Sequence, residues 1–301
     1  MAVFSKKTAK RMLLLCTMLA TGIAANGQEE NIPAFSNIEA EALAPAFRES
    51  VEQEGLTQRE VLKSTDISQT LKGFTFDGKS LFSSFTEGPK AIPQDGIIST
   101  VCRLLSIYIS DYQTSDATGA IRIYGASRRA RQTYHFEGEI RIKKVIRHYF
   151  GGMGADSASN VLIATYQFRE DPQKEGSGVY SGTYAAQINT DISYNYLDNT
   201  IKREVTLDRR ENSSPYYYNR CFVGCWTSYA TGVSLPAIWG DDRLPFTSQW
   251  FDVGNEHLVP AEEYTDNEWE EVLNGSRLEP YYNEDGEPMG WRCKDEWWTK
   301  Y

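Results

Sequence analysis

Apolar and polar side chains alternate along most of this chain, so that every second side chain is apolar. This pattern constrains the fold more than any other feature of the sequence. The alternation begins near Gly73 and recurs in short runs to about residue 260. Ile121 and Ile123, for example, are separated by Arg122. A period of two is that of a β-strand with one face in a core and the other in water. Turn signals between the runs indicate antiparallel sheet.

These runs predict a mainly β fold. We expect about eight to ten antiparallel strands between residues 73 and 260, closed into a barrel or stacked as a sandwich. The stretch from Ile97 to Ile109 can also be read as a helix, and we interpret it as a strand. The fold class is therefore an antiparallel barrel or sandwich with a short helical N-terminal segment.

Residues 28–72 have the period of a helix. Pro45 interrupts the pattern, so we expect a kinked helix or two short pieces. A second helix is expected to begin at Thr57 and to include Val61 and Leu62. The apolar residues that recur at helical spacing in the first helix include Ile38, Leu43, Phe47 and Val51.

The first 27 residues have the pattern of a secretory signal peptide. Lys6, Lys7, Lys10 and Arg11 form a basic head, and an uncharged apolar run follows to Ala25. We expect cleavage near Ala25 or Gly27 and export to the periplasm, the cell surface or the medium. The apolar run is shorter than the roughly 20 residues of a membrane-spanning helix, so we expect no transmembrane segment.

Cys16 lies inside the apolar run and raises the alternative of a lipid anchor. Lipoprotein signals require a small residue just before the acylated cysteine, whereas Leu13, Leu14 and Leu15 precede it here. Most of the apolar run would also remain after a cut at Cys16. We favour its loss with the leader.

Four cysteines remain after the leader: Cys102, Cys221, Cys225 and Cys293. An even number in an exported protein predicts two disulfides. If Cys221 and Cys225 lie in one strand, they are roughly 13 Å apart, beyond the reach of a disulfide. We therefore expect each to pair with Cys102 or Cys293, in an order left open. A four-cysteine zinc site and free buried thiols are the alternatives.

The chain is acidic, with 31 basic and 41 acidic side chains and a formal charge of −10. Such a field disfavours nucleic acid and anionic membrane surfaces as partners. The sequence has no Gly-x-Ser-x-Gly elbow, zinc-protease helix, Walker motif or dinucleotide glycine motif. We therefore predict no cofactor, no metal and no catalytic residue.

One strand brings titratable groups together. His135, Glu137 and Glu139 point to one face and could bind a metal or transfer a proton. The same face continues with Arg141 and Lys143. We favour a solvated strand face.

Aromatic residues lie near carboxylates in the region 226–256. Indole faces stack on sugar rings while carboxylates accept hydrogen bonds from hydroxyls, so this region is our candidate contact surface. A hydrolase would use two of Asp241, Asp242, Asp252 and Glu256. The predicted ligand-binding residues are Trp226, Tyr229, Trp239, Asp241, Asp242, Trp250 and Phe251.

Residues 261–301 combine acidic and aromatic side chains, including Trp269, Trp291, Trp297 and Trp298. Exposed indoles are costly in water, so we expect this segment to pack on the β domain. The chain thus divides into a signal peptide (1–27), a helical lead-in or docking segment (28–72), an antiparallel β domain (73–260) and an acidic aromatic C-terminal segment (261–301).

The stretch Phe222-x-Gly224-x-Trp226-x-x-Tyr229 resembles the Gly-x-Trp strand of lipocalin-like barrels. The resemblance implies a barrel with a tryptophan plugging one end and an apolar ligand inside. The motif opens the barrel in that family, but about 75 residues follow it here, so a barrel must be built mostly from earlier strands. The overall layout also resembles uncharacterised exported proteins of Bacteroides-type gut bacteria, which implies no activity.

We therefore predict an exported, non-enzymatic β-protein that binds a glycan, an apolar ligand or a protein partner. A carbohydrate-active hydrolase using paired carboxylates is one alternative. The other is a structural component of a cell-surface assembly, with the segment from Gln28 to Lys72 engaging a neighbour.

Overall fold

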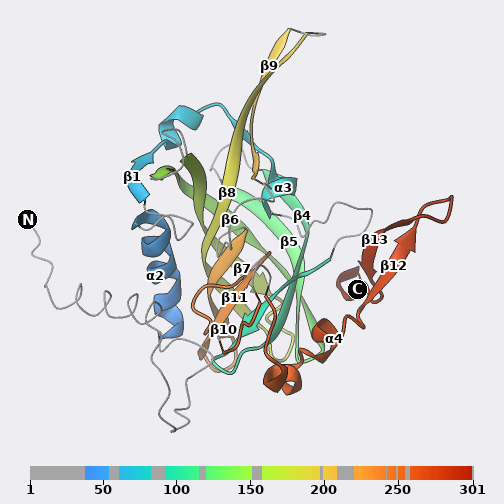
Figure 1. Cartoon of the computed structure of the whole chain (residues 1–301). Coiled ribbons are helices and arrows are strands. Elements are labelled where there is room, and N and C mark those ends of the chain that lie inside the picture. Colours follow the sequence, from blue (N-terminus) through green and yellow to red (C-terminus); the bar gives the residue numbers. More distant parts are fainter. Residues whose placement is uncertain are drawn as a thin grey trace, which may run out of the picture. The chain divides into compact units, whose positions relative to one another are not determined.

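The computed structural model describes residues 38–53, 61–82, 92–114, 120–150, 158–196, 199–208, 220–241, 243–248, 250–254 and 258–299. These residues belong to one unit of the chain, residues 33–301. The leader, Cys16 and the predicted cleavage point lie outside the described residues. Figure 1 shows the arrangement of the helices and strands.

The fold is mainly β, as the alternation predicted, and ten strands lie between residues 73 and 260 in the described part of the chain. They are β2 (Thr75–Phe76), β3 (Gln94–Ile98), β4 (Arg103–Thr114), β5 (Ala120–Arg129), β6 (Gln132–Phe150), β7 (Ala158–Glu170), β8 (Gly178–Asn195), β9 (Thr200–Leu207), β10 (Cys221–Ser228) and β11 (Ser234–Gly240).

Eight of these strands close into an antiparallel ring. The order is β3-β4-β5-β6-β7-β8-β10-β11, and β11 pairs back with β3. Of the barrel and the sandwich left open by the sequence, the pairing gives the barrel. Six of the eight strands precede β10, so the barrel is built mostly from strands before the Gly-x-Trp motif.

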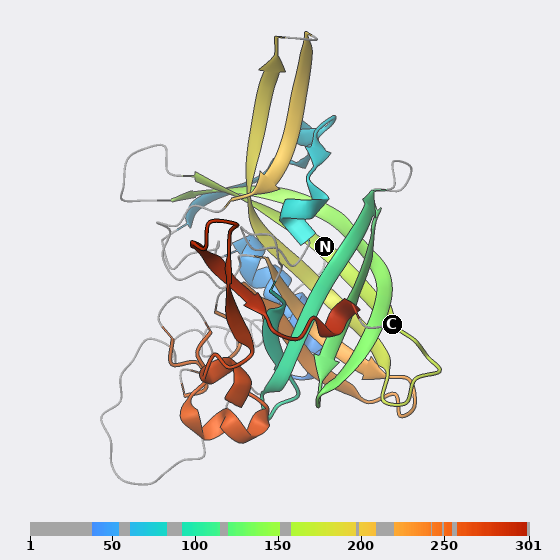
Figure 2. The ribbon, with the colours of Figure 1, turned by 90° about the vertical axis from the view of Figure 1, so that its right-hand side faces the viewer.

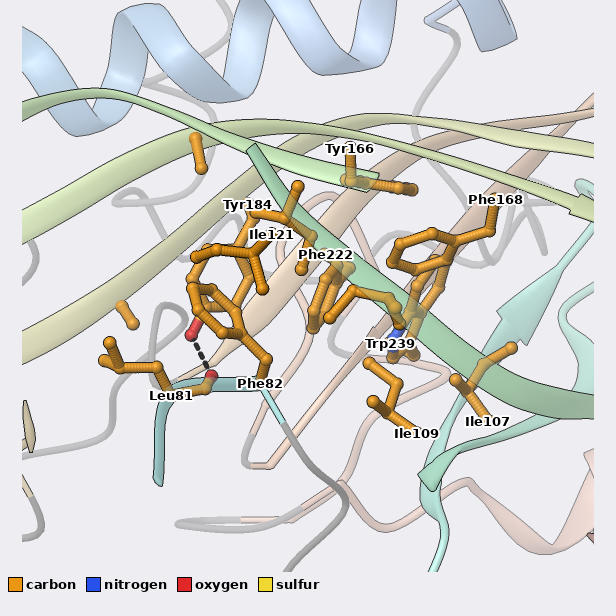
Figure 3. Close-up of a cluster of buried hydrophobic side chains, with 14 of the residues drawn as sticks. Leu81, Phe82, Ile107, Ile109, Ile121, Tyr166, Phe168, Tyr184, Phe222 and Trp239 are labelled. Atoms are coloured by element: carbon orange, nitrogen blue, oxygen red, sulfur yellow. Dashed lines mark hydrogen bonds between the residues drawn. The ribbon is translucent and has the colours of Figure 1, made fainter. Parts of the chain in front are cut away.

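Aromatic side chains from neighbouring strands fill the centre of the barrel (Figure 3). The Phe222 and Trp239 rings stack with centroids 4.9 Å apart. Tyr166 meets Trp239 edge-on at 5.3 Å, and Phe168 packs beside them. The interior space that a ligand would occupy in an open barrel is thus taken by the protein's own side chains.

Two glycines make room for these rings. Gly182 and Gly224 face each other across β8 and β10. A Cβ atom on Gly224 would lie 2.0 Å from the carbonyl oxygen of Ser181, and one on Gly182 would lie 2.8 Å from the Tyr166 hydroxyl. The small side chains therefore allow close strand approach and leave space for Tyr166.

Each end of the barrel is closed by its own contacts. Helix α3 (Gly78–Phe82) places Leu81 and Phe82 in the core at one end, where the Tyr184 hydroxyl donates a hydrogen bond to the Leu81 carbonyl. At the other end, Arg129 and Glu170 form a buried ion pair. The short helix η1 (Ser68–Leu71) precedes α3.

Helix α2 (Ala40–Gln53) packs on the outside of the barrel, against β8, β10 and β11. Leu43, Phe47 and Val51 lie on its buried face, as the helical spacing predicted. The helix runs through Pro45 as one element, because packing on both sides of the proline outweighs one lost backbone bond. In the described part of the chain, no helix is long and apolar enough to cross a membrane.

The second predicted helix is wrong at Val61 and Leu62. These residues begin strand β1 (Val61–Asp66), which pairs with β6 along the edge that extends beyond β5. The open edge supplies backbone partners that local helix propensity does not take into account. Thr57 lies outside the described residues. The stretch from Ile97 to Ile109 forms two strands, β3 and β4, joined by a turn.

Much of the C-terminal segment packs on the barrel, and three of its four tryptophans, Trp269, Trp297 and Trp298, are buried. Trp269 is fully buried, and its Nε1 donates to the Cys102 carbonyl at 2.8 Å. Trp298 stacks on Tyr108 with centroids 4.3 Å apart. The elements are η2 (Glu262–Asn267), α4 (Glu270–Leu273), β12 (Leu278–Tyr282), β13 (Pro288–Cys293) and η3 (Trp297–Thr299).

The two predicted disulfides are wrong: Cys102, Cys221, Cys225 and Cys293 are buried, and none of these four forms a disulfide. Cys221 and Cys225 do lie in one strand, as expected. The thiols pack as small apolar groups, and they are divided between different environments. Cys102 and Cys221 belong to the cluster beneath α2, whereas Cys293 packs near Trp298.

Burial also makes two of these thiols unreactive. It raises the pKa of Cys102 to about 12 and that of Cys293 to about 11. Because the thiolate is the reactive form, neither sulfur is a nucleophile at neutral pH.

Candidate functional site

The predicted aromatic contact residues do not form one surface. Trp239 and Phe251 are fully buried, in the barrel core and in the cluster beneath α2 respectively. Trp226 closes one barrel end, and Tyr229 lies beside it, 41% exposed. Trp250 is 53% exposed. Trp226 and Tyr229 share a partner, since both donate hydrogen bonds to Glu170.

The predicted carboxylates are engaged in arginine pairs. Asp241 accepts two hydrogen bonds from Arg220, at 2.5 and 2.7 Å. The buried Asp252 accepts one from Arg243 at 2.8 Å. Asp242 and Glu256 lie outside the described residues. The Asp241 and Asp252 carboxylates therefore both take part in charge-assisted hydrogen bonds within the protein, which indicates a structural role for these two residues.

The group around His135 lies on the outer face of β6. Glu139 pairs with Arg141 at 2.7 Å. Hydrogen bonding to that guanidinium lowers the pKa of Glu139. The described residues contain no cluster of three or more His, Cys, Asp or Glu side chains that could hold a metal ion.

The buried Arg129–Glu170 pair organises one barrel end. Arg129 donates to both carboxylate oxygens of Glu170, at 2.6 and 2.8 Å. Ser127 and Trp226 donate to the same carboxylate, at 2.6 and 3.1 Å. The Arg129 guanidinium lies 4.7 Å from the Trp226 ring centroid. This network satisfies a charge that would otherwise be costly to bury.

Next to this network, a cleft of about 470 Å³ separates the β5–β6 turn from the C-terminal segment. Positively and negatively charged side chains line this cleft. Arg128 faces Asp295 at 3.5 Å, and the deeper Arg277 is bound to Asp95. The charged lining residues are Arg128, Arg129, Arg131, Arg277, Lys294, Asp266, Glu268, Glu270, Glu271 and Asp295.

The β5–β6 turn that forms one wall has an unusual backbone. Ala130 and Arg131 both have positive φ angles, 48° and 59°, which residues other than glycine rarely adopt. The Ala130 N–H donates to Glu268 Oε2 at 3.1 Å, and Glu268 itself has a φ of 79°. Contact across the cleft therefore holds two strained segments together.

The other wall continues into a two-stranded ribbon, β12–β13, which we call the C-terminal ribbon (Figures 1 and 2). At its base, Leu278 pairs with Cys293 and packs on the barrel. On the same face Pro280 pairs with Trp291 nearer the tip. The large apolar side chains left in solvent on this ribbon are Trp291, Tyr282 and Met289, exposed by 58%, 58% and 53%.

Sequence reasoning missed this ribbon. It predicted that the whole C-terminal segment packs on the barrel, which is wrong for Trp291. The available signal was the turn Asp285-Gly286 between two short apolar runs, which is typical of a hairpin. A two-stranded ribbon can bury its base and still expose its tip.

Comparisons with protein-family models, curated proteins and solved structures find no match for this chain. The function is therefore argued from the geometry of the molecule.

Proposed function

We propose that the protein is an exported, non-enzymatic binding protein whose partner is another polypeptide. The partner contacts the C-terminal ribbon and the adjoining cleft. Export follows from the basic and apolar leader pattern. The absence of a catalytic role is supported by Asp241 and Asp252, which are both held in arginine pairs.

One observation carries the choice of a polypeptide. The apolar face of the C-terminal ribbon is partly buried at Leu278 and buried at Cys293 but continues into solvent at Trp291 and Tyr282. Tryptophan, tyrosine and methionine are enriched in protein interfaces, and tryptophan and tyrosine often contribute most of the binding energy. An exposed ribbon face of this composition favours a partner that covers it.

The cleft supports the same choice. Its wall offers guanidinium groups and carboxylates within one cavity, so a complementary ligand must present both signs of charge. Polypeptides do so along one chain. A glycan is less well supported, because Trp239 and Phe251 are buried, and an apolar ligand inside the barrel would have to displace the packed rings.

The assembly role remains a second candidate for the same surface. The segment from 28 to 72 is a weaker docking element, because helix α2 already packs its apolar face on the barrel. An assembly contact would therefore use the C-terminal ribbon.

The test is capture of partners from the envelope and medium of the source cells on the immobilised protein. We expect a captured protein to bind with a Kd that rises at least 30-fold in Trp291→Ala, as for an interface hot spot of about 2 kcal/mol. Trp250→Ala is the matched control, because Trp250 is an equally exposed indole elsewhere. Equal binding by wild type and Trp291→Ala would remove the assignment.

A further inference from the structure

Strands β8 and β9 extend beyond the barrel as a second ribbon, on which the partner surface proposed above does not depend. From Asn189 to Asn195, strand β8 pairs only with β9, and from Thr200 to Arg203, strand β9 pairs only with β8. Strand β2 joins the other edge of β9 at Glu204 and Val205. Figures 1 and 2 both show this ribbon projecting from the barrel. We call residues 190–196 and 199–204 the β8–β9 arm.

The arm has one apolar face and one polar face. Ile192 pairs with Arg203 and Tyr194 pairs with Ile201, so these four side chains share a face with Tyr196. Its apolar members are largely in solvent: Ile192 is 67% exposed, Tyr194 46%, Tyr196 84% and Ile201 54%. The opposite face carries Asp191, Ser193, Asn195, Thr200, Lys202 and Glu204.

The apolar face is a compact patch on a projecting element. Taking about 200 Å² for each full side chain, the four exposed fractions amount to about 500 Å². A shallow amphipathic element is retained at a bilayer surface by a few inserted side chains.

The chemistry of the face matches the bilayer interface. Tyrosine is enriched at the depth of lipid headgroups. The Tyr194 hydroxyl donates to Asn199 Oδ1 at 2.7 Å, which lowers the cost of moving that hydroxyl into an apolar layer. Arg203 has no ion-pair partner among the described residues and lies beside Ile192. Its guanidinium can therefore reach a lipid phosphate while its stem stays in the apolar layer.

The depth of insertion is set by the polar parts of the arm. Both outer edges of the arm leave alternate backbone groups without a strand partner in the described part of the chain, and such groups cannot enter the hydrocarbon core. The arm must therefore lie in the interface with its apolar face toward the acyl chains. The negative charge of the rest of the protein has little effect at the arm, because salt screens charges beyond about 10 Å.

We propose that the β8–β9 arm binds the surface of a phospholipid bilayer. Ile192, Tyr194, Tyr196 and Ile201 enter the interface, and Arg203 contacts the phosphates. The arm would thereby hold the protein at a membrane surface.

The experiment is flotation of the purified protein with phosphatidylcholine vesicles. We expect wild type to float and the double variant Ile192→Thr/Ile201→Thr to lose at least tenfold in partition coefficient. Threonine keeps the β-branch of isoleucine, so the arm retains its strand propensity. Leu62→Thr is the matched control, because Leu62 is a 64% exposed strand residue away from the arm.

Two further variants keep the test independent of arm folding. Tyr196→Ser changes the most exposed apolar side chain and should weaken flotation several-fold, as should Arg203→Gln. Absence of wild-type flotation, or flotation unchanged in the double variant, would overturn the proposal. A concentration-dependent dimer in sedimentation, lost in the double variant and without flotation, would assign the arm to a second copy instead and would equally contradict it.

Discussion

The hydroxyl groups of Tyr166 and Tyr184 both lie inside the barrel, but they differ in their hydrogen bonding. The Tyr184 hydroxyl donates to the Leu81 carbonyl. The Tyr166 hydroxyl has no hydrogen-bond partner in the described part of the chain. Burial raises the pKa of both phenols. A buried donor without a partner lowers stability, whereas a satisfied one raises it modestly.

The two tyrosines therefore predict opposite responses to loss of the hydroxyl. Tyr166→Phe should raise the free energy of unfolding by about 1 kcal/mol, and Tyr184→Phe should lower it by about 0.5–1.5 kcal/mol. Urea denaturation of the two variants measures both values. A loss of stability in Tyr166→Phe would show that its hydroxyl has a partner after all.

His148 is fully buried beneath α2, where Ser64 Oγ and the Val51 carbonyl lie within hydrogen-bond distance of its ring nitrogens. Burial lowers its pKa, and the contact with the Val51 carbonyl opposes this in part. The folded state therefore releases a proton that the unfolded state still binds. Stability from this group is present above the unfolded pKa of about 6.5.

This predicts that stability falls as the pH drops below about 6.5, by at most about 1.4 kcal/mol per pH unit. Thermal unfolding at pH 7.5 and 5.5 measures the slope. In His148→Gln the slope over this interval should be smaller than in wild type. An unchanged slope would assign the titration to other groups.

At the scale of elements, α2 shows how packing determines a helix that propensity alone leaves uncertain. Leu43, Phe47 and Val51 recur every four residues, and all three are fully buried against the barrel. Tertiary contact supplies most of the stability of a short amphipathic helix. This is why α2 continues through Pro45.

Phe47→Ala should therefore lower the free energy of unfolding by about 3–5 kcal/mol, because it leaves a cavity beneath the helix. Arg48→Ala, on the exposed side of the same turn, should change it by no more than about 0.5 kcal/mol. Chemical denaturation compares the two. Similar losses in both variants would place α2 away from the barrel.

The strands were predictable because most of them have one face toward the core and one toward solvent. β10 and β11 are different: Phe222 and Trp239 point into the barrel, while Val223 and Ile238 lie beneath α2. A strand covered on both sides no longer reveals which aromatics are exposed. The predicted contact surface therefore included Trp239, which is a core residue.

Long-range partners were the other part that sequence could not supply. Alternation predicted that β3 and β11 are strands, but their pairing joins residues about 140 positions apart and closes the ring. The same limit applies to the cysteines, whose strand positions were predictable and whose neighbours were not. β1 was misread because its stability comes from the edge of β6.

At the scale of the molecule, the interior and the exterior of the barrel have different roles. Aromatic rings occupy the centre of the barrel, and buried contacts close each end. Seven of the fifteen large apolar side chains that are exposed in the described part of the chain lie on two ribbons, among them Trp291 on the C-terminal ribbon and Tyr196 on the β8–β9 arm. We therefore locate binding outside the barrel.

Diffraction from crystals held under xenon pressure tests this division most directly, because xenon enters empty apolar cavities. We predict no xenon site among Tyr166, Phe168, Phe222 and Trp239. A xenon atom bound within that ring cluster would reveal a ligand-sized space inside the barrel and would contradict a purely external binding surface.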